Sequence, residues 1–524
     1  MHSERTASVD RGEQKPNILL IMADQMTPFL TGAYGHPVVK TPNLDRLVEQ
    51  GVRFDAAYTN CPLCGPARAS LMTGRYASNI RCYDNASPLS CDQPSIAHYL
   101  SIEGYDTVAS GKMHFIGPDQ LHGFRKRLTT DIYPSDFVWT TTREHKNRTM
   151  WKGITHAAGY ATPKVGVREW SIDLAYDEEV SFRALEYIRA RVDTGSPWRP
   201  TETHKPFFLC VSFNNPHGPF HVTQELWDLY EGEHIEIPEF PDNVEETYSS
   251  MDRWLYTFHG VDRVPLLRDP ESLYALRRSY YGLVSYVDRK VGELLKTLED
   301  TGLGDSTIII FASDHGDMLC EKGLVQKKMF YEWSARVPLI ITFPDSWPLG
   351  DIPSRVCKEP VSLVDLAPTI LDMAGVGERL PLDGKSLIGL LQTADEGDAG
   401  EREVFSEMHT EGVFSTCFMI RRGRYKYVYV HGEDSQLFDL EADPGEWNNL
   451  AGVPEFKDVE AELKARILDE FNPDEIEGDV RASLLRRRLI KKAMRYTGTH
   501  WDYAPEFDAT KQYIRGDYGP QVDD

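Results

Sequence analysis

The sequence predicts an α/β fold, and two features carry this prediction. Short apolar runs, each about as long as one strand, recur along the chain, and amphipathic helical stretches lie between them. The runs show little alternation with polar residues, which is typical of parallel strands that helices cover on both faces. Four runs have this form: 16–22, 206–213, 307–311 and 338–343.

The clearest helix is predicted over Glu271–Asp300. Apolar residues there recur every three or four positions, and Gly302 follows as a stop signal. A shorter capped helix is predicted from Asn43 to Gly51. The repeating positions of the long helix are expected in the core: Leu276, Tyr280, Leu283, Val287, Val291 and Leu295.

Near residue 380 the apolar runs and helical stretches give way to a segment rich in Gly and Asp (393–400), which indicates a boundary. Beyond it, the runs 417–421 and 425–430 flank Arg422-Gly423 and predict a hairpin. A basic helical segment, 481–495, precedes a polar aromatic tail. We therefore expect four parts: a disordered leader (1–15), an α/β domain that carries the chemistry (16–385), a smaller α+β subdomain (386–475), and a helix and tail (476–524) that are candidates for contacts between subunits.

Composition narrows the function classes. The 57 basic and 81 acidic residues give a net charge of −24, which argues against nucleic acid and anionic membranes as partners. No run of 18 apolar residues exists, and residues 1–15 contain no apolar signal segment. The eight cysteines are too scattered for a disulfide framework. A cytoplasmic enzyme is expected.

Polar residues follow three of the predicted strands: Asp24-Gln25, Asn214 to His217, and Asp314-His315. In open α/β sheets, ligands bind at the carboxyl ends of strands. A single carboxylate at a strand end is more often a turn residue than a ligand. The repetition at distant places in the sequence predicts that these side chains gather at one edge of the sheet.

The segment Cys64-Gly-Pro-Ala-Arg68 places a nucleophile beside an anion site. Pro66 suits a first helical turn, so Cys64 is expected just ahead of a helix that runs to Gly74. Helix N-termini favour anions, and Arg68 adds a fork of donors suited to an oxyanion. However, Cys61-Pro-Leu-Cys64 is also a CxxC pair, which is typical of redox or metal sites. The spacing alone leaves both interpretations open.

The block Cys64 to Arg68, together with Ala69-Ser-Leu-Met-Thr-Gly74, resembles the signature of the type I sulfatases. In that family the cysteine is oxidised to formylglycine by a formylglycine-generating or equivalent maturation enzyme. The resemblance implies an alkaline-phosphatase-like sulfatase fold, with a large mixed sheet flanked by helices and a smaller C-terminal subdomain with an antiparallel sheet. It also implies hydrolysis of a small sulfate ester.

Further residues match the family's site. The implied metal ligands are Asp24, Gln25, Cys64, Asp314 and His315. Oxygen ligands favour Ca²⁺, and Mg²⁺, Mn²⁺ or Zn²⁺ remain candidates because a histidine is present. The implied catalytic residues are Cys64, Arg68, Lys112, His114, His217 and Lys327, with Lys328 as the competitor of Lys327. His114 would act as the base that releases sulfate.

The segments 111–115, 117–124, 128–134, 501–503 and 511–515 look like choline sulfatases in particular. That likeness implies choline O-sulfate as substrate, with its trimethylammonium group held by an aromatic face and carboxylates. Trp139 matches the aromatic residue, and His156 matches a family histidine. Glu407 is the expected carboxylate, with Glu411 as its rival. Asp517 is not clearly in register with a second carboxylate.

Two other functions remain to be distinguished. Phosphonate monoester and phosphodiester hydrolases of the same superfamily share the Cys-Gly-Pro-Ala-Arg form. A function of another class would use Cys61 and Cys64 as an intact dithiol, in a redox or binding protein. A homo-oligomer, either a dimer or a tetramer, is expected in the sulfatase case.

Overall fold

The computed structural model describes residues 15–141, 156–192, 205–344, 347, 354–392 and 402–501. Eight strands in these ranges form one large sheet in the order β12-β2-β11-β9-β1-β7-β4-β5. β11 is antiparallel to both of its neighbours, and the other pairs are parallel, so the sheet is mixed as expected. The strands are β1 (Asn17–Ala23), β2 (Gly51–Phe54), β4 (Asp106–Gly111), β5 (Lys126–Arg127), β7 (Phe207–Ser212), β9 (Thr307–Ser313), β11 (Leu339–Thr342) and β12 (Arg355–Cys357).

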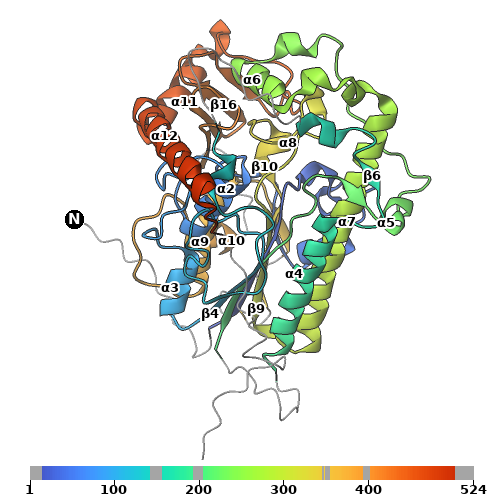
Figure 1. Cartoon of the computed structure of the whole chain (residues 1–524), viewed down its shortest axis with the longest axis vertical. Coiled ribbons are helices and arrows are strands. Elements are labelled where there is room, and N and C mark those ends of the chain that lie inside the picture. Colours follow the sequence, from blue (N-terminus) through green and yellow to red (C-terminus); the bar gives the residue numbers. More distant parts are fainter. Residues whose placement is uncertain are drawn as a thin grey trace, which may run out of the picture.

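Helices cover both faces of this sheet (Figure 1). Leu19 and Ile21 of β1 share one core with α1 (Pro42–Glu49), α4 (Ile172–Arg189) and α7 (Pro270–Asp300). Ile18 and Leu20 share the opposite core with α2 (Cys64–Thr73), α3 (Ile96–Ile102) and α9 (Leu366–Met373). Alternate residues of β1 thus enter two different cores, and this explains why residues 18–23 of the strand are all apolar.

The remaining elements are short or belong to the C-terminal part. The short strands are β3 (Ala57–Tyr58), β6 (Gly166–Val167), β8 (His221–Val222), β10 (Arg336–Val337) and β13 (Val361–Ser362). The short helices are α5 (Gln224–Asp228), α6 (Ser250–His259), α8 (Glu332–Ala335) and α10 (Ile388–Gln392). Within the described ranges, no helix combines the length and the apolar character that crossing a bilayer requires.

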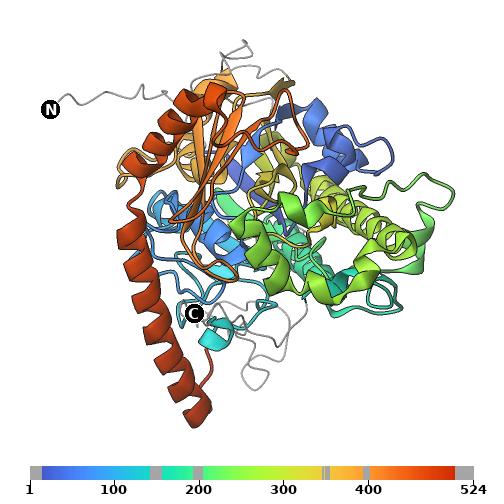
Figure 2. The ribbon, with the colours of Figure 1, turned by 90° about the horizontal axis from the view of Figure 1, so that it is seen from above.

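A second sheet follows late in the chain. It is four-stranded and antiparallel, and it contains β14 (Glu403–Met408), β15 (Cys417–Arg422), β16 (Tyr425–Val430) and β17 (Gln436–Asp439). Helix α11 (Lys457–Glu470) packs on it through Leu463 and Ile467. The last helix, α12 (Pro473–Thr497), runs along one side of the molecule (Figure 2). Its Val480 and Leu484 pack against Tyr83, which lies beyond α2.

These elements confirm the four predicted strands, the long helix and the hairpin. All six repeating residues of the long helix are buried. One boundary differs, because Cys64 is the first residue of α2 and does not precede it. Leu63 is the extended cap residue, and its carbonyl accepts the N–H of Ala67 at 2.9 Å. The first turn therefore closes one residue earlier than predicted, and Gly74 ends the helix in the left-handed conformation. The predicted limits of the four parts stay predictions.

Candidate active site

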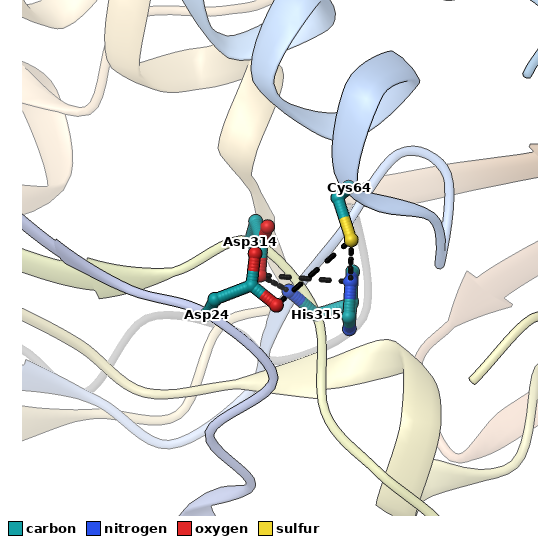
Figure 3. A group of neighbouring side chains, drawn as sticks. All are labelled: Asp24, Cys64, Asp314 and His315. Atoms are coloured by element: carbon teal, nitrogen blue, oxygen red, sulfur yellow. Dashed lines mark hydrogen bonds and ion pairs between the residues drawn. The ribbon is translucent and has the colours of Figure 1, made fainter. Parts of the chain in front are cut away.

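Two neighbouring parallel strands bring two carboxylates together. Ala23 of β1 pairs with Ser313 of β9, so Asp24 and Asp314, the next residues, lie side by side at the carboxyl edge. Cys64 meets them from the first turn of α2. Its Sγ lies 3.1 Å from Nε2 of His315 and 3.9 Å from Oδ1 of Asp24. Figure 3 shows this group, in which all four residues are buried and one potential ligand atom of each lies within 4.8 Å of the others.

Arg68 and Lys112 hold the two carboxylates. Nε of Arg68 donates to Asp314 at 2.8 Å, and its Nη2 donates to Asp24 at 3.0 Å. Nζ of Lys112 lies 2.6 Å from Asp24. Burial raises the pKa of Asp24, but Lys112 and Arg68 outweigh it and hold that pKa well below its usual value. Burial and the nearby Asp24 raise the pKa of Asp314 to about 6.

This donor set suits a divalent cation. Two buried carboxylates repel each other, and burial together with Asp24 raises the pKa of Asp314, so a cation bound between them would stabilise their charged forms. Carboxylate oxygens with one imidazole and the side chain of residue 64 match Ca²⁺, Mg²⁺ or Mn²⁺, and they tolerate Zn²⁺. The residues present therefore fit the metal that the sequence predicts.

Gln25 adjoins this cluster, but its side chain has other partners. Its Nε2 donates to the hydroxyl of Tyr160 at 2.9 Å and to the carboxylate of Asp317, and its Oε1 accepts from Nζ of Lys327. Only its backbone N–H, which donates to Asp314 at 3.1 Å, contacts the cluster. Its assignment as a metal ligand stays a prediction.

The electrostatic surroundings of Cys64 favour an anion. Burial and Asp24 raise the pKa of the thiol, whereas Lys112, Lys327 and His315 lower it. The effect of the three positive groups is the larger one, so the pKa of the Cys64 thiol lies well below the usual value of a cysteine. An oxyanion on the same Cβ would meet the same three positive groups.

His217 and Lys327 form the next pair. Nζ of Lys327 lies 2.9 Å from Nε2 of His217, and Nδ1 of His217 donates to the carbonyl of Gly218 at 2.5 Å. Burial, followed by the charge of Lys327, holds the pKa of His217 well below its usual value. The adjacent Lys328 faces elsewhere and lies 3.7 Å from the carboxylate of Glu411.

His114 follows β4 in the left-handed conformation, with φ 60°. Its backbone N–H donates to Asp131 at 2.8 Å, and its Nε2 lies 3.2 Å from the carbonyl oxygen of Asn85. The ring centroid lies 5.7 Å from that of Trp139 and 5.3 Å from that of Tyr133.

A cavity of about 690 Å³ leads from Cys64 to an aromatic wall. Trp139, which is 39% exposed, contacts Tyr133 edge to face, with ring centroids 4.9 Å apart. His156 and Phe258 lie nearby, with ring centroids 5.6 Å apart. The lining residues are Cys64, Asn85, Tyr133, Val138 to Thr141, His156, His217, Phe258, Gln326 to Lys328, Thr410 to Phe414, Lys491 and Arg495.

Of the two rival glutamates, Glu411 lines this cavity and Glu407 does not. Glu407 is fully buried in β14, where it accepts the N–H of Ser78 at 2.9 Å and pairs with Nε2 of His409 at 2.8 Å. Glu411 lies in the turn beyond that strand, with φ 52°. The side chain of Glu407 thus points into the core, and its rival Glu411 is the glutamate on the cavity wall; which of them meets the substrate stays a prediction.

Several lining residues were missed from the sequence. Tyr133 lies within the segment 128–134, which carried the family likeness, so a signal was present. Asn85 and Phe258 lie in stretches without a motif. Lys491 and Arg495 belong to α12, and only the folded chain brings this helix to the cavity.

Comparisons with known proteins agree with this geometry. The model of the family "Sulfatase" matches residues 16–376, "N-sulphoglucosamine sulphohydrolase, C-terminal" matches 320–472, and "Choline sulfatase enzyme C terminal" matches 478–523. A choline-sulfatase of Rhizobium meliloti is 39% identical over 96% of both chains. The multifunctional alkaline phosphatase superfamily protein PehA of Trinickia caryophylli is 30% identical, over 84% of this chain and 92% of that one.

A solved phosphonate monoester hydrolase from Agrobacterium radiobacter superposes with a TM-score of 0.66 and 25% identity, over 90% of this chain and 96% of that one. These matches confirm the expected alkaline-phosphatase-like architecture. They favour the sulfatase function over a redox or binding protein that would use Cys61 and Cys64 as a dithiol. The chain belongs to the sulfatase family and is a sulfuric ester hydrolase that resembles the choline-sulfatases.

Proposed function

We propose that the protein hydrolyses choline O-sulfate to choline and sulfate, with formylglycine derived from Cys64 as the nucleophile. The observation that carries this proposal is the single cavity that joins Cys64 to an aromatic wall and a carboxylate. Choline O-sulfate has an anionic end and a cationic end. The lining offers Lys327 to the anionic end, and Trp139 and Glu411 to the cationic end.

A divalent metal would be held by Asp24, Asp314, His315 and residue 64. We favour Ca²⁺, and Mg²⁺, Mn²⁺ and Zn²⁺ are the alternatives. When bound, it offsets negative charge at the sulfate and at the nucleophilic oxygen. Arg68 orients the two carboxylates and offsets their mutual repulsion, because its guanidinium bridges them. Lys112 adds a positive charge 2.6 Å from Asp24.

The leaving group needs a proton, and Lys327 supplies it. His217 stays neutral because burial and Lys327 depress its pKa, so its Nε2 lone pair accepts a hydrogen bond from the Lys327 ammonium. His114 acts in the second step as the base that allows sulfate to depart. The converted side chain of residue 64 supplies two hydroxyl groups as its hydrate, one for attack and one for this deprotonation.

The cationic end of the substrate is recognised without hydrogen bonds, because a trimethylammonium group has no N–H. The ring of Trp139 offers a π face, and Glu411 offers negative charge. His156 adds no competing charge, since burial and Lys328 lower its pKa to about 3 and it stays neutral. Besides the pair that Glu411 makes with Lys328, the lining carries the positive side chains of Lys327, Lys491 and Arg495.

Specificity constants test the proposal. One preparation should be measured on choline O-sulfate, nitrophenyl sulfate, a phosphodiester and a phosphonate monoester, and choline O-sulfate should be the best substrate. The likeness to the Agrobacterium radiobacter structure favours a second candidate, hydrolysis of phosphonate monoesters. A higher kcat/KM for the phosphonate than for both sulfates would support that candidate and contradict ours.

A homo-oligomer, dimer or tetramer, completes the proposal. Helix α12 carries large apolar side chains that are exposed in the single chain, namely Leu485, Leu489 and Tyr496. Such a stripe on a long surface helix is typical of a face that packs against another copy. Light scattering on the purified protein should give more than one chain per particle, and a monomer would contradict this part.

A further inference from the structure

A buried ion pair ties the C-terminal helix to the loop beside His114. Arg487 of α12 donates from both of its terminal nitrogens to the two carboxylate oxygens of Asp84, at 2.6 and 2.8 Å. Both side chains are buried. A bidentate pair of this kind fixes orientation as well as distance. Neither residue lines the cavity.

Asp84 also shapes the turn that follows it. Its Oδ1 accepts the N–H of Ala86 and the hydroxyl of Ser87, each at 3.0 Å. These bonds close a short turn around Asn85, the residue between Asp84 and Ala86. The ion pair therefore fixes the turn that contains Asn85, a residue of the cavity lining.

Asn85 contacts three separate parts of the site. Its backbone N–H donates to Oε1 of Glu411 at 2.7 Å, and its side-chain Oδ1 accepts the N–H of Gly65 at 2.8 Å. Its carbonyl oxygen lies 3.2 Å from Nε2 of His114. The bonds to Gly65 and Glu411 anchor Asn85 at two points, and its carbonyl is the group that faces His114.

The carbonyl of Asn85 also determines which nitrogen of His114 can act as a base. A carbonyl oxygen only accepts hydrogen bonds, so Nε2 must carry the proton of the neutral ring. The lone pair then lies on Nδ1. This atom is buried and has no hydrogen-bond partner among the residues that the structure describes. An unpartnered lone pair of this kind is what a general base must offer.

We propose that the Asp84–Arg487 pair positions His114 for the second chemical step, through Asn85; this inference rests on the proposed function. In that step, Nδ1 of His114 removes the proton from the hydroxyl of residue 64 that does not carry sulfate. The electron pair of that O–H bond forms the C=O bond of the aldehyde. The bond from the same carbon to the sulfate oxygen breaks, and sulfate leaves with its electron pair. Asp84 and Arg487 are positioning residues, because they touch no reacting atom.

The test is Arg487→Met, assayed with nitrophenyl sulfate. We expect kcat to fall by about tenfold to a hundredfold, the size of a loss caused by a misplaced catalytic group. KM should fall by a similar factor and leave kcat/KM unchanged, because kcat/KM reports only the steps up to sulfuryl transfer. Acid-quenched samples should contain enzyme that is heavier by one sulfuryl group. Arg481→Met is the matched control, since Arg481 pairs with Glu477 of the same helix in the part of the chain that the structure describes, and it should leave all three quantities unchanged.

Two further variants test the inference in case Arg487→Met does not fold. The double variant Asp84→Asn with Arg487→Met leaves no unpaired charge in the interior, so it should fold and show the same kinetic signature. Arg487→Lys keeps the charge and should recover part of kcat. A crystal structure of Arg487→Met, which needs no conversion of Cys64, should show Nε2 of His114 displaced from the Asn85 carbonyl.

Equal losses of kcat and kcat/KM without sulfated enzyme, or unchanged kinetics, would overturn the inference. His114→Ala separates this failure from a failure of the proposed function. If His114→Ala does not accumulate sulfated enzyme, the assigned role of His114 is wrong. If it does, and the Arg487 variants do not, only the role of the ion pair is wrong.

Discussion

Nζ of Lys327 lies 2.9 Å from Nε2 of His217, whereas the neighbouring Lys328 turns toward Glu411. The backbone explains the divergence, since Gln326 and Lys328 both have positive φ and direct consecutive side chains to different walls. Of these two lysines, Lys327 is the one that contacts the histidine, and we therefore propose Lys327 as the acid for the leaving group.

Lys327→Met should lower kcat/KM for choline O-sulfate by about a hundredfold or more, since general-acid catalysis is of that size. Nitrophenyl sulfate should lose far less, because nitrophenolate leaves without a proton. Lys328→Met is the matched control. Because Lys328 pairs with Glu411, this variant is compared on aryl sulfates whose leaving groups differ in pKa, and their relative rates should stay unchanged. Equal losses on both esters in Lys327→Met would show that this lysine binds sulfate and is not the acid.

Conversion of Cys64 should be visible in the mass of the tryptic peptide 54–68, which should carry an aldehyde or its hydrate in place of the thiol. Cys64→Ala should abolish turnover and leave the fold intact. Cys64→Ser should attack once and stall as a sulfate ester, because serine has no second hydroxyl. Cys61→Ser, the control for a dithiol, should keep its activity. Sustained turnover by Cys64→Ser would contradict the mechanism.

Metal binding should weaken in acid. Burial and the nearby Asp24 raise the pKa of Asp314 to about 6, so the metal-free protein takes up a proton there as the pH falls through that value. The proton competes with the cation for the same oxygen, and the apparent metal affinity should therefore fall below about pH 6. Titration of metal into protein dialysed against EDTA, at several pH values, measures this.

Asp24→Asn and Asp314→Asn should each reduce both metal content and rate by orders of magnitude, because each removes one negative charge from the ligand set. The two readouts should fall together. Full activity in protein shown by elemental analysis to be free of metal would refute the assignment of this cluster.

Parts of the site could be predicted because they depend on regular structure. The carboxyl ends of neighbouring parallel strands share one edge, so Asp24 and Asp314 were expected to meet. Glu407 and Glu411 could not be separated, because the difference depends on where β14 ends and on its contact with Ser78. The link from Arg487 to Asp84 joins segments that no local pattern connects. Contacts between a loop and a distant helix leave no periodic signal in the sequence.

Recognition of the quaternary ammonium gives the last prediction. Trp139→Ala should weaken the binding of choline O-sulfate relative to nitrophenyl sulfate by about 1–2 kcal/mol, the size of a cation–π contact that is partly shielded from water. Glu411→Gln should act in the same direction, because it removes negative charge from the cavity wall.

Glu407→Gln is the matched control, since Glu407 lies in the core and not on the cavity. Glu407→Gln should change kcat/KM by the same factor for both esters. Any such change should come from lower folding stability, which thermal unfolding measures. The measurement is the ratio of kcat/KM for the two esters in each variant. An unchanged ratio in both Trp139→Ala and Glu411→Gln would mean that these residues only shape the cavity, and choline O-sulfate would then no longer be the preferred assignment.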